Sequence, residues 1–75
     1  MADRNTIGQR VRRMRLGRRL SQEALAELAG VRASTIARIE GGHRTPRPAT
    51  IRQLAKALNV SQWSLMLGDA DEPEM

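Results

Sequence analysis

The sequence predicts an all-α, compact domain of five short helices, and three observations point to this fold class. No segment alternates polar and apolar residues at the period of a strand, whereas apolar residues recur at helical spacing along the chain. Ser, Thr, Pro, Gly and Asn stand where short helices would begin and end. Seventy-five residues suffice for one small domain, and the chain has no cysteine for a disulfide framework or a zinc ribbon.

The first two expected helices occupy the segment up to Gly30. The first begins after Thr6, which forms a capping-box pattern with Gln9, and fades near residues 16–20. The second is about eight residues long, begins after the N-cap Ser21 and ends at Gly30. Apolar side chains at helical spacing are expected to form the buried stripes, which are Ile7, Val11 and Met14 in the first helix and Leu25, Leu28 and Ala29 in the second.

The third expected helix spans about residues 32–40, and a pair of glycines closes it. Thr35, Ile36 and Ile39 have helical spacing. Arg32 stands at the start, where Ser, Thr, Asp or Asn would cap better, and the missing cap costs about 1 kcal/mol.

The remaining helices follow a loop that contains two prolines. Pro48 suits the first turn of the fourth helix, which ends near Asn59. Ser61 caps a fifth helix over residues 62–67, and Gly68 ends it. We therefore expect a domain over residues 1–68 and a disordered acidic tail over residues 69–75. The expected apolar stripe of the fourth helix is Ile51, Leu54, Ala55 and Leu58.

The charge distribution favours an anionic partner. All 13 basic residues, 12 of them Arg, lie between Arg4 and Lys56, and residues 1–67 hold only four acids, which gives this part a net charge of +9. Such a body favours nucleic acid or a membrane surface, although arginines that merely solvate the surface are the simpler alternative. Trp63 is the single aromatic residue, so a base-stacking platform for single strands is absent and duplex DNA is favoured.

The segment around Gly30 joins the second and third helices too tightly for them to run antiparallel. A steep crossing needs a small residue at the contact, and Ala26 lies four positions before Gly30. Ile36 and Ile39 then return to the core one turn apart. A helix, a tight turn and a helix with these spacings are typical of the helix-turn-helix motif.

The stretch "SQEALAELAGVRASTIARIEGG" resembles the helix-turn-helix of the lambda-repressor-like (Cro/cI, XRE) family of DNA-binding regulators. The likeness extends from about Ile7 to Gly68, roughly four fifths of the chain, and includes "RQLAKALNVSQWSLMLG". It implies a five-helix lambda-repressor-like domain that binds double-stranded DNA as a transcriptional regulator, most often a repressor. The chain departs from the family pattern at Arg32, where Ser or Thr is common, and at Arg19, where Gly is common.

The resemblance also implies site residues, with the third helix in the major groove as the recognition helix. Gly41 and Gly42 would let the loop approach the duplex. For Gln22 and Arg32, the simpler alternative is that each is an ordinary surface residue. Arg10, Arg12 and Arg13 are expected on the outer face of the first helix, either near the flanking DNA backbone or merely solvated. The implied base contacts are Arg32, Ala33, Ser34 and Arg38, the implied phosphate contacts are Gln22, Thr35, His43, Arg44, Thr45 and Arg47, and Arg15 and Glu40 are implied as a structural ion pair.

The last helix is expected to supply a homodimer interface, because one short recognition helix reads only a few base pairs. Leu65 is assigned to the core, whereas Trp63, Met66 and Leu67 cannot all join it and remain for a partner copy. The alternative for Trp63 is packing within its own chain.

Other classes of function fit the sequence less well. A protein-interaction module, such as an antitoxin-like protein in which DNA binding is secondary or lost, is the main alternative. No helix has the face of a membrane-surface binder, and the residues needed for an enzyme, a metal site or a cofactor are absent: no Cys, no Tyr, one His and no pair of carboxylates placed for acid–base chemistry. With no membrane span and no signal peptide we expect a cytoplasmic, bacterial or phage-type protein. A phage repressor, a restriction–modification controller, an antitoxin and the N-terminal domain of a longer regulator remain open.

Overall fold

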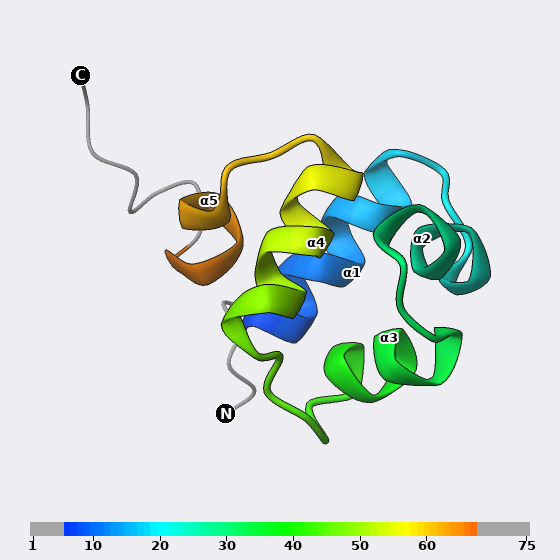
Figure 1. Cartoon of the computed structure of the whole chain (residues 1–75), viewed down its shortest axis with the longest axis horizontal. Coiled ribbons are helices and arrows are strands. Elements are labelled where there is room, and N and C mark those ends of the chain that lie inside the picture. Colours follow the sequence, from blue (N-terminus) through cyan, green and yellow to red (C-terminus); the bar gives the residue numbers. More distant parts are fainter. Residues whose placement is uncertain (1–5, 68–75) are drawn as a thin grey trace.

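A computed structural model describes residues 6–67 and has the expected all-α architecture in this range (Figure 1). Each of the five expected helices is present, within a residue or two of the expected bounds. Gly68 and the acidic residues 69–75 lie outside the described residues. The helices are α1 (Ile7–Gly17), α2 (Gln22–Ala29), α3 (Ala33–Glu40), α4 (Pro48–Leu58) and α5 (Gln62–Leu67).

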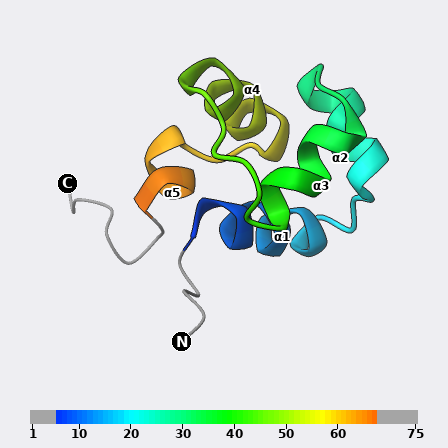
Figure 2. The same ribbon diagram turned by 90° about the horizontal axis from the view of Figure 1, so that it is seen from below.

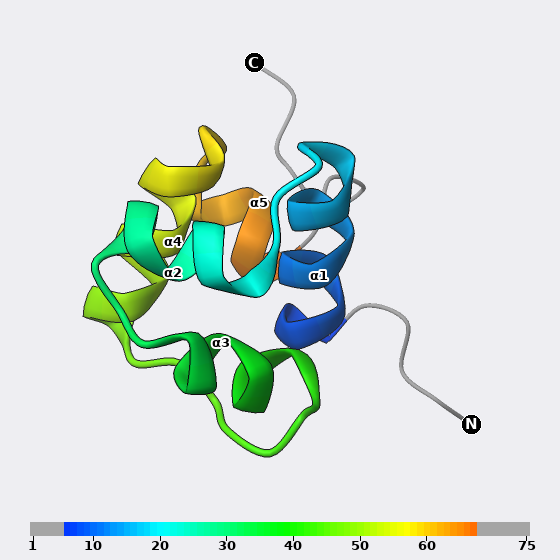
Figure 3. The same ribbon diagram turned by 90° about the vertical axis from the view of Figure 1, so that its right-hand side faces the viewer.

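All five helices contribute to one hydrophobic core. Helix α1 packs against α3, α4 and α5, while α2 packs against α3 and α4, as Figures 1 and 3 show. The prediction that Leu28 belongs to the buried stripe of α2 is wrong, since this side chain is 61% exposed. An eight-residue helix packs only one side against the core. The buried apolar residues are Val11, Leu25, Ala26, Ala29, Ile36, Ile39, Leu54, Ala55, Leu58 and Leu65.

Three helices begin at a hydroxyl side chain that accepts a hydrogen bond from the first turn. Thr6 Oγ1 accepts from the Gln9 N–H at 3.2 Å, and Ser21 and Ser61 act in the same way on α2 and α5. The capping box at Thr6 is only half formed, because Gln9 Oε1 is buried without a hydrogen-bond partner in the described part of the chain. Local sequence therefore determines where these helices start.

Helices α3 and α4 begin differently. Their N-cap residues are Arg32 and Arg47, and neither side chain makes a capping hydrogen bond. Pro48 fills the first position of α4, as the sequence predicts. The two helices therefore start without side-chain caps.

Four described residues have left-handed backbone conformations, and two of them, Gly30 and Arg19, lie in the links on either side of α2. Gly30, at φ 72°, ends α2 and begins a three-residue link to α3. A Cβ at this position would meet no atom within 4 Å, so glycine is required by the left-handed backbone conformation and not by a lack of space. Ala26 provides the close contact and is buried. Arg19, which follows α1, has φ 57°, a left-handed backbone conformation that is unfavourable for a residue with a Cβ.

Helix α1 crosses α3 at very short range. A Cβ on Gly8 would lie 2.1 Å from the carbonyl oxygen of Ile39, so only glycine fits at this crossing. The contact fixes the C-terminal end of α3 against α1. Helix α3 and the 41–47 loop consequently lie together on one side of the molecule, the side facing the viewer in Figure 2.

Candidate nucleic-acid interface

The outer face of α3 borders a depression of about 560 Å³ surrounded by arginines. Arg32 contributes from the N-cap of α3, Arg38 from its last turn, and Arg44 from the loop that follows. Side-chain hydroxyls lie between these guanidinium groups, so the depression combines positive charge with neutral hydrogen-bonding groups. Its lining residues are Val31, Arg32, Ser34, Thr35, Arg38, Arg44 and Thr50.

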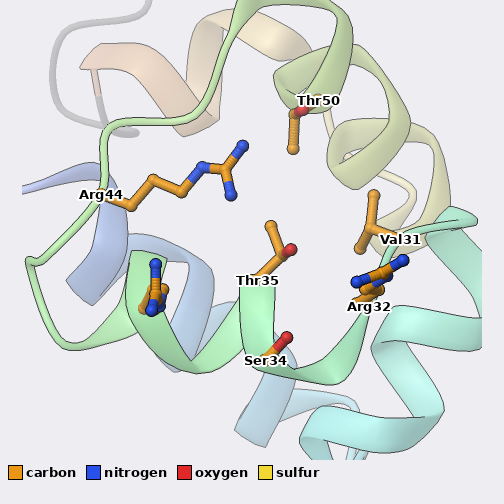
Figure 4. A pocket seen from close by; sticks show the side chains of 7 residues that line it. Val31, Arg32, Ser34, Thr35, Arg44 and Thr50 are labelled. Atoms are coloured by element: carbon orange, nitrogen blue, oxygen red, sulfur yellow. The ribbon is translucent and has the colours of Figure 1, made fainter.

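Figure 4 shows how the loop closes this depression. The Arg44 side chain extends from the loop towards Thr35, and Thr50 lies across the opening on α4. No sequence pattern indicates Thr50, because the distance from the first turn of α4 to α3 depends on the path of the 41–47 loop. Thr50 is therefore a site residue that only the structure identifies.

The other residues implied for DNA contact lie around the depression without lining it. His43, Thr45 and Arg47 are exposed on the loop. Ala33 is only partly exposed, since part of its surface packs against the core. The exposed residues of α3 and its N-cap are thus Arg32, Ser34, Ala37 and Arg38.

Arg15 and Glu40 form a bidentate ion pair beside this face. Arg15 Nε donates to Glu40 Oε2 at 2.7 Å and Nη2 donates to Oε1 at 2.9 Å, while Nη1 donates to the carbonyl of Leu20 at 2.8 Å. The hydrogen bonds that Arg15 donates to the Glu40 carboxylate raise the pKa of Arg15, and the charges of Glu40 and Glu23 act in the same direction against the effect of burial. Arg15 is therefore held as a cation under all ordinary conditions.

Gln22, the first residue of α2, extends this pair into a three-residue network. Its Nε2 donates to Glu40 Oε1 at 3.2 Å, which uses one of the two amide N–H groups. The network borders a second depression, of about 310 Å³, to which Arg12 adds a further guanidinium group. Gln22 is half-buried here, and its amide is hydrogen-bonded to Glu40.

Arg10 corrects the expectation for the arginines of α1. Arg12 and Arg13 are exposed as expected, but Arg10 is only 4% exposed. Its guanidinium donates to the carbonyl of Leu65 at 2.6 Å and also to the carbonyl of Met66. The last carbonyls of a helix lack intrahelical partners, and Arg10 satisfies two of them at the end of α5. Arg10 follows Ile7 by three residues, so helical spacing already indicated that both side chains lie on the buried side of α1.

Helix α5 presents an apolar surface on the outside of the domain. Trp63, Met66 and Leu67 are 44%, 51% and 40% exposed, whereas Leu65 on the same helix is completely buried. Three large apolar side chains on a six-residue helix form a compact patch, which we call the α5 patch.

Two kinds of structural feature are absent from residues 6–67. None of the helices there is long and apolar enough to cross a bilayer. In the same range no three His, Asp or Glu side chains come together as a metal site.

Two short helices joined through a left-handed glycine, with the second helix exposed among arginines, define a lambda-repressor-like helix-turn-helix domain. Comparison with known proteins agrees: residues 6–63 match the family described as helix-turn-helix domain, and the chain belongs to this family.

Relatives and solved structures resemble the chain over most of its length. The HTH-type transcriptional repressor RghR of Bacillus subtilis (strain 168) is 44% identical over 62 residues, which are 81% of this chain and 46% of that protein. The restriction-modification controller protein C.AhdI from Aeromonas hydrophila has a TM-score of 0.80 and 38% identity, covering 88% of this chain and 100% of that chain. The P22 c2 repressor in complex with synthetic operator 9T has a TM-score of 0.79 and 32% identity, covering 84% of this chain and 96% of that chain. The chain spans less than half the length of the first curated relatives that it matches.

Proposed function

We propose that this protein is a sequence-specific regulator of transcription that binds double-stranded DNA through α3 and acts as a repressor. The observation that carries the proposal is the depression beside α3, where three guanidinium groups and several hydroxyls surround an exposed helix face. Such a face matches a duplex, whose phosphates are attracted by the arginines and whose base edges are read by hydrogen bonds. The repressor and the operator complex named among the similar proteins support the same function.

Base readout is assigned to four residues at the N-cap and on the outer side of α3. Arg32 and Arg38 each carry a guanidinium that can hold guanine O6 and N7 together, and one such pair contributes about 1–3 kcal/mol of discrimination. Ser34 and the methyl group of Ala33 complete the base-reading set. The phosphate contacts are assigned to Gln22, Thr35, His43, Arg44, Thr45 and Arg47, which surround this face.

A homodimer on a two-fold symmetric operator follows from the size of the domain. An eight-residue recognition helix covers only a few base pairs, so a second copy is needed for useful specificity. The α5 patch is the surface we assign to this contact, because burial against a second copy would remove Trp63, Met66 and Leu67 from water. The two recognition helices would then reach half-sites about 34 Å apart, one turn of the duplex.

In-vitro selection from a random duplex library tests the proposal, at about 150 mM salt, where non-specific phosphate binding is weakened. We expect enrichment of one two-fold symmetric sequence, which would establish both base readout and dimeric binding. Recovery of unselected DNA would contradict sequence-specific recognition, and enrichment of a single half-site would contradict the dimer.

Two substitutions separate base readout from phosphate contact. Arg38→Ala should lower the affinity for the selected site about tenfold and relax the preference at one position, because a loss of about 1.4 kcal/mol is a factor of ten. Gln22→Ala should weaken binding to all sequences nearly equally, since phosphates carry no sequence information. Binding of both variants to the selected site and to single-base variants of it provides the measurement. Identical specificity profiles for the two variants would contradict these roles.

A further inference from the structure

Glu40 lies where three helices of the domain meet. It ends α3, accepts two hydrogen bonds from Arg15 of α1, and accepts a third from Gln22 of α2. Its side chain is only 5% exposed, so the carboxylate is fixed in place and out of reach of a large ligand. Glu40 therefore acts on its surroundings through Arg15 and Gln22.

The hydrogen bond to Glu40 determines the direction of the Gln22 amide. A primary amide is planar and carries two N–H groups, so anchoring one of them at 3.2 Å on Glu40 Oε1 fixes where the other points. A glutamine side chain loses rotamer freedom when it is ordered, and Glu40 imposes this order before a ligand arrives. The same contact joins the first residue of α2 to the last residue of α3.

The charges around the second depression allow an anion to approach. Glu40 alone would repel a phosphate, but its two-point pairing with Arg15 offsets the negative charge. Arg12 lines the same depression, is exposed, and adds a positive charge beside Gln22 that forms no ion pair within residues 6–67. The depression therefore offers a phosphate an oriented amide and a guanidinium group.

We propose that Glu40 is a positioning residue for DNA binding: it does not touch the duplex, but it orients Gln22 towards one backbone phosphate and fixes that contact relative to the recognition helix. This inference rests on the function proposed above. It assigns to the ion pair of Arg15 and Glu40 a role beyond stabilising the fold, because the same carboxylate that pairs with α1 holds the amide of α2.

A double-mutant cycle on the full chain tests this role. Affinity for the selected duplex is measured at 10 °C for the wild type, Gln22→Ala, Glu40→Ala and the double variant, and each value is corrected for the folded fraction found by circular dichroism. We expect Gln22→Ala to lower affinity about tenfold in the wild type, as loss of one charge-assisted hydrogen bond does, and less than twofold in the Glu40→Ala background. Arg44→Ala is the control, because Arg44 lines the other depression. This substitution should lower the affinity for the duplex by the same factor in the wild-type and Glu40→Ala backgrounds.

The outcomes separate this inference from the proposed function. An equal loss for Gln22→Ala in both backgrounds would overturn the positioning role and leave DNA binding intact. No loss in the wild type would overturn both the positioning role and the phosphate contact. If Glu40→Ala does not fold, Glu40→Asp is used instead, because it keeps the charge for Arg15 but shortens the side chain by about 1.5 Å, beyond hydrogen-bond reach of Gln22. The Gln22→Ala effect should then fall in the same way, and an undiminished effect would refute the role.

Discussion

The crossing of α1 over α3 gives the sharpest test of the fold, through the substitution Gly8→Ala. The new Cβ would lie 2.1 Å from the carbonyl oxygen of Ile39, 3.1 Å from its carbonyl carbon and 3.3 Å from the Cα of Glu40. All three are backbone atoms, so no side chain can rotate away. A contact below 3.0 Å is essentially never observed, and relief therefore requires the two helices to separate by about 0.9 Å.

The expected magnitude follows from two opposing effects. Replacing glycine by alanine inside a helix stabilises it by about 1 kcal/mol. Overpacking costs about 1–3 kcal/mol and sometimes more, and a clash between two backbones belongs at the upper end of that range. We expect the free energy of unfolding to fall by about 2 kcal/mol, a large part of the roughly 3–5 kcal/mol that a core of this size supplies.

Urea unfolding at 25 °C, followed by circular dichroism at 222 nm, measures this change. Gly17→Ala is the matched control, because Gly17 lies in the same helix and a Cβ there would meet no atom within 4 Å. That variant should gain up to about 1 kcal/mol. If Gly8→Ala proved as stable as Gly17→Ala, the close crossing and the position of Glu40 that depends on it would be refuted.

Two further predictions concern Arg19 and Arg32, where the resemblance described above implies a departure from the family pattern. Arg19→Gly should stabilise the domain by about 0.5–1 kcal/mol, because a residue with a Cβ at φ 57° is strained, whereas Asn59→Gly at the same φ should gain less since Asn tolerates this conformation. Thermal unfolding compares them, and a lower melting temperature for Arg19→Gly would contradict the strain. Arg32→Ser should add a helix cap and stabilise the fold by about 1 kcal/mol, yet lower affinity for the selected duplex about tenfold. Arg13→Ser, which removes the same charge from the exposed face of α1, is the control, and an equal affinity loss for both would refute base contact by Arg32.

The starts and ends of the helices could be predicted because they depend on residues within one turn. Thr6, Ser21 and Ser61 each cap a backbone N–H three positions ahead, and Asn59 ends α4 in a left-handed conformation. Such contacts are formed by neighbours in the sequence, whatever the rest of the chain does. The spacing of Ile36 and Ile39 likewise sufficed to predict the buried side of α3, and hence which of its residues face outwards.

Most of the missed features depend on residues far away in the sequence, although the helical spacing of Arg10 and Ile7 was a local sign that Arg10 is buried. Gly8 gives no local sign that its partner is Ile39, and Arg10 reaches carbonyls that lie 55 and 56 positions later. Leu28 has the spacing of a core residue but falls outside the part of α2 that the other helices cover. Within the candidate site, the residues of α3 could be predicted from the helical period and the family resemblance. The position of Thr50 and the hydrogen bond of Gln22 to Glu40 required the packing of α2, α3 and α4.

The distribution of helix caps links stability to the proposed function. The three helices that begin away from the depression beside α3 begin at Thr or Ser and cap themselves, whereas α3 and α4, whose first turns line that depression, begin at arginine without a cap. Two missing caps cost about 2 kcal/mol, which is substantial for so small a core. Selection for stability alone would favour a hydroxyl at Arg32, where the backbone already has the extended conformation of an N-cap. An arginine at this N-cap agrees with our proposal that its charge serves the DNA, since the N–H groups of an uncapped first turn then remain available to the same anion. The opposite effects expected for Arg32→Ser on stability and on DNA affinity express this conflict in a single substitution.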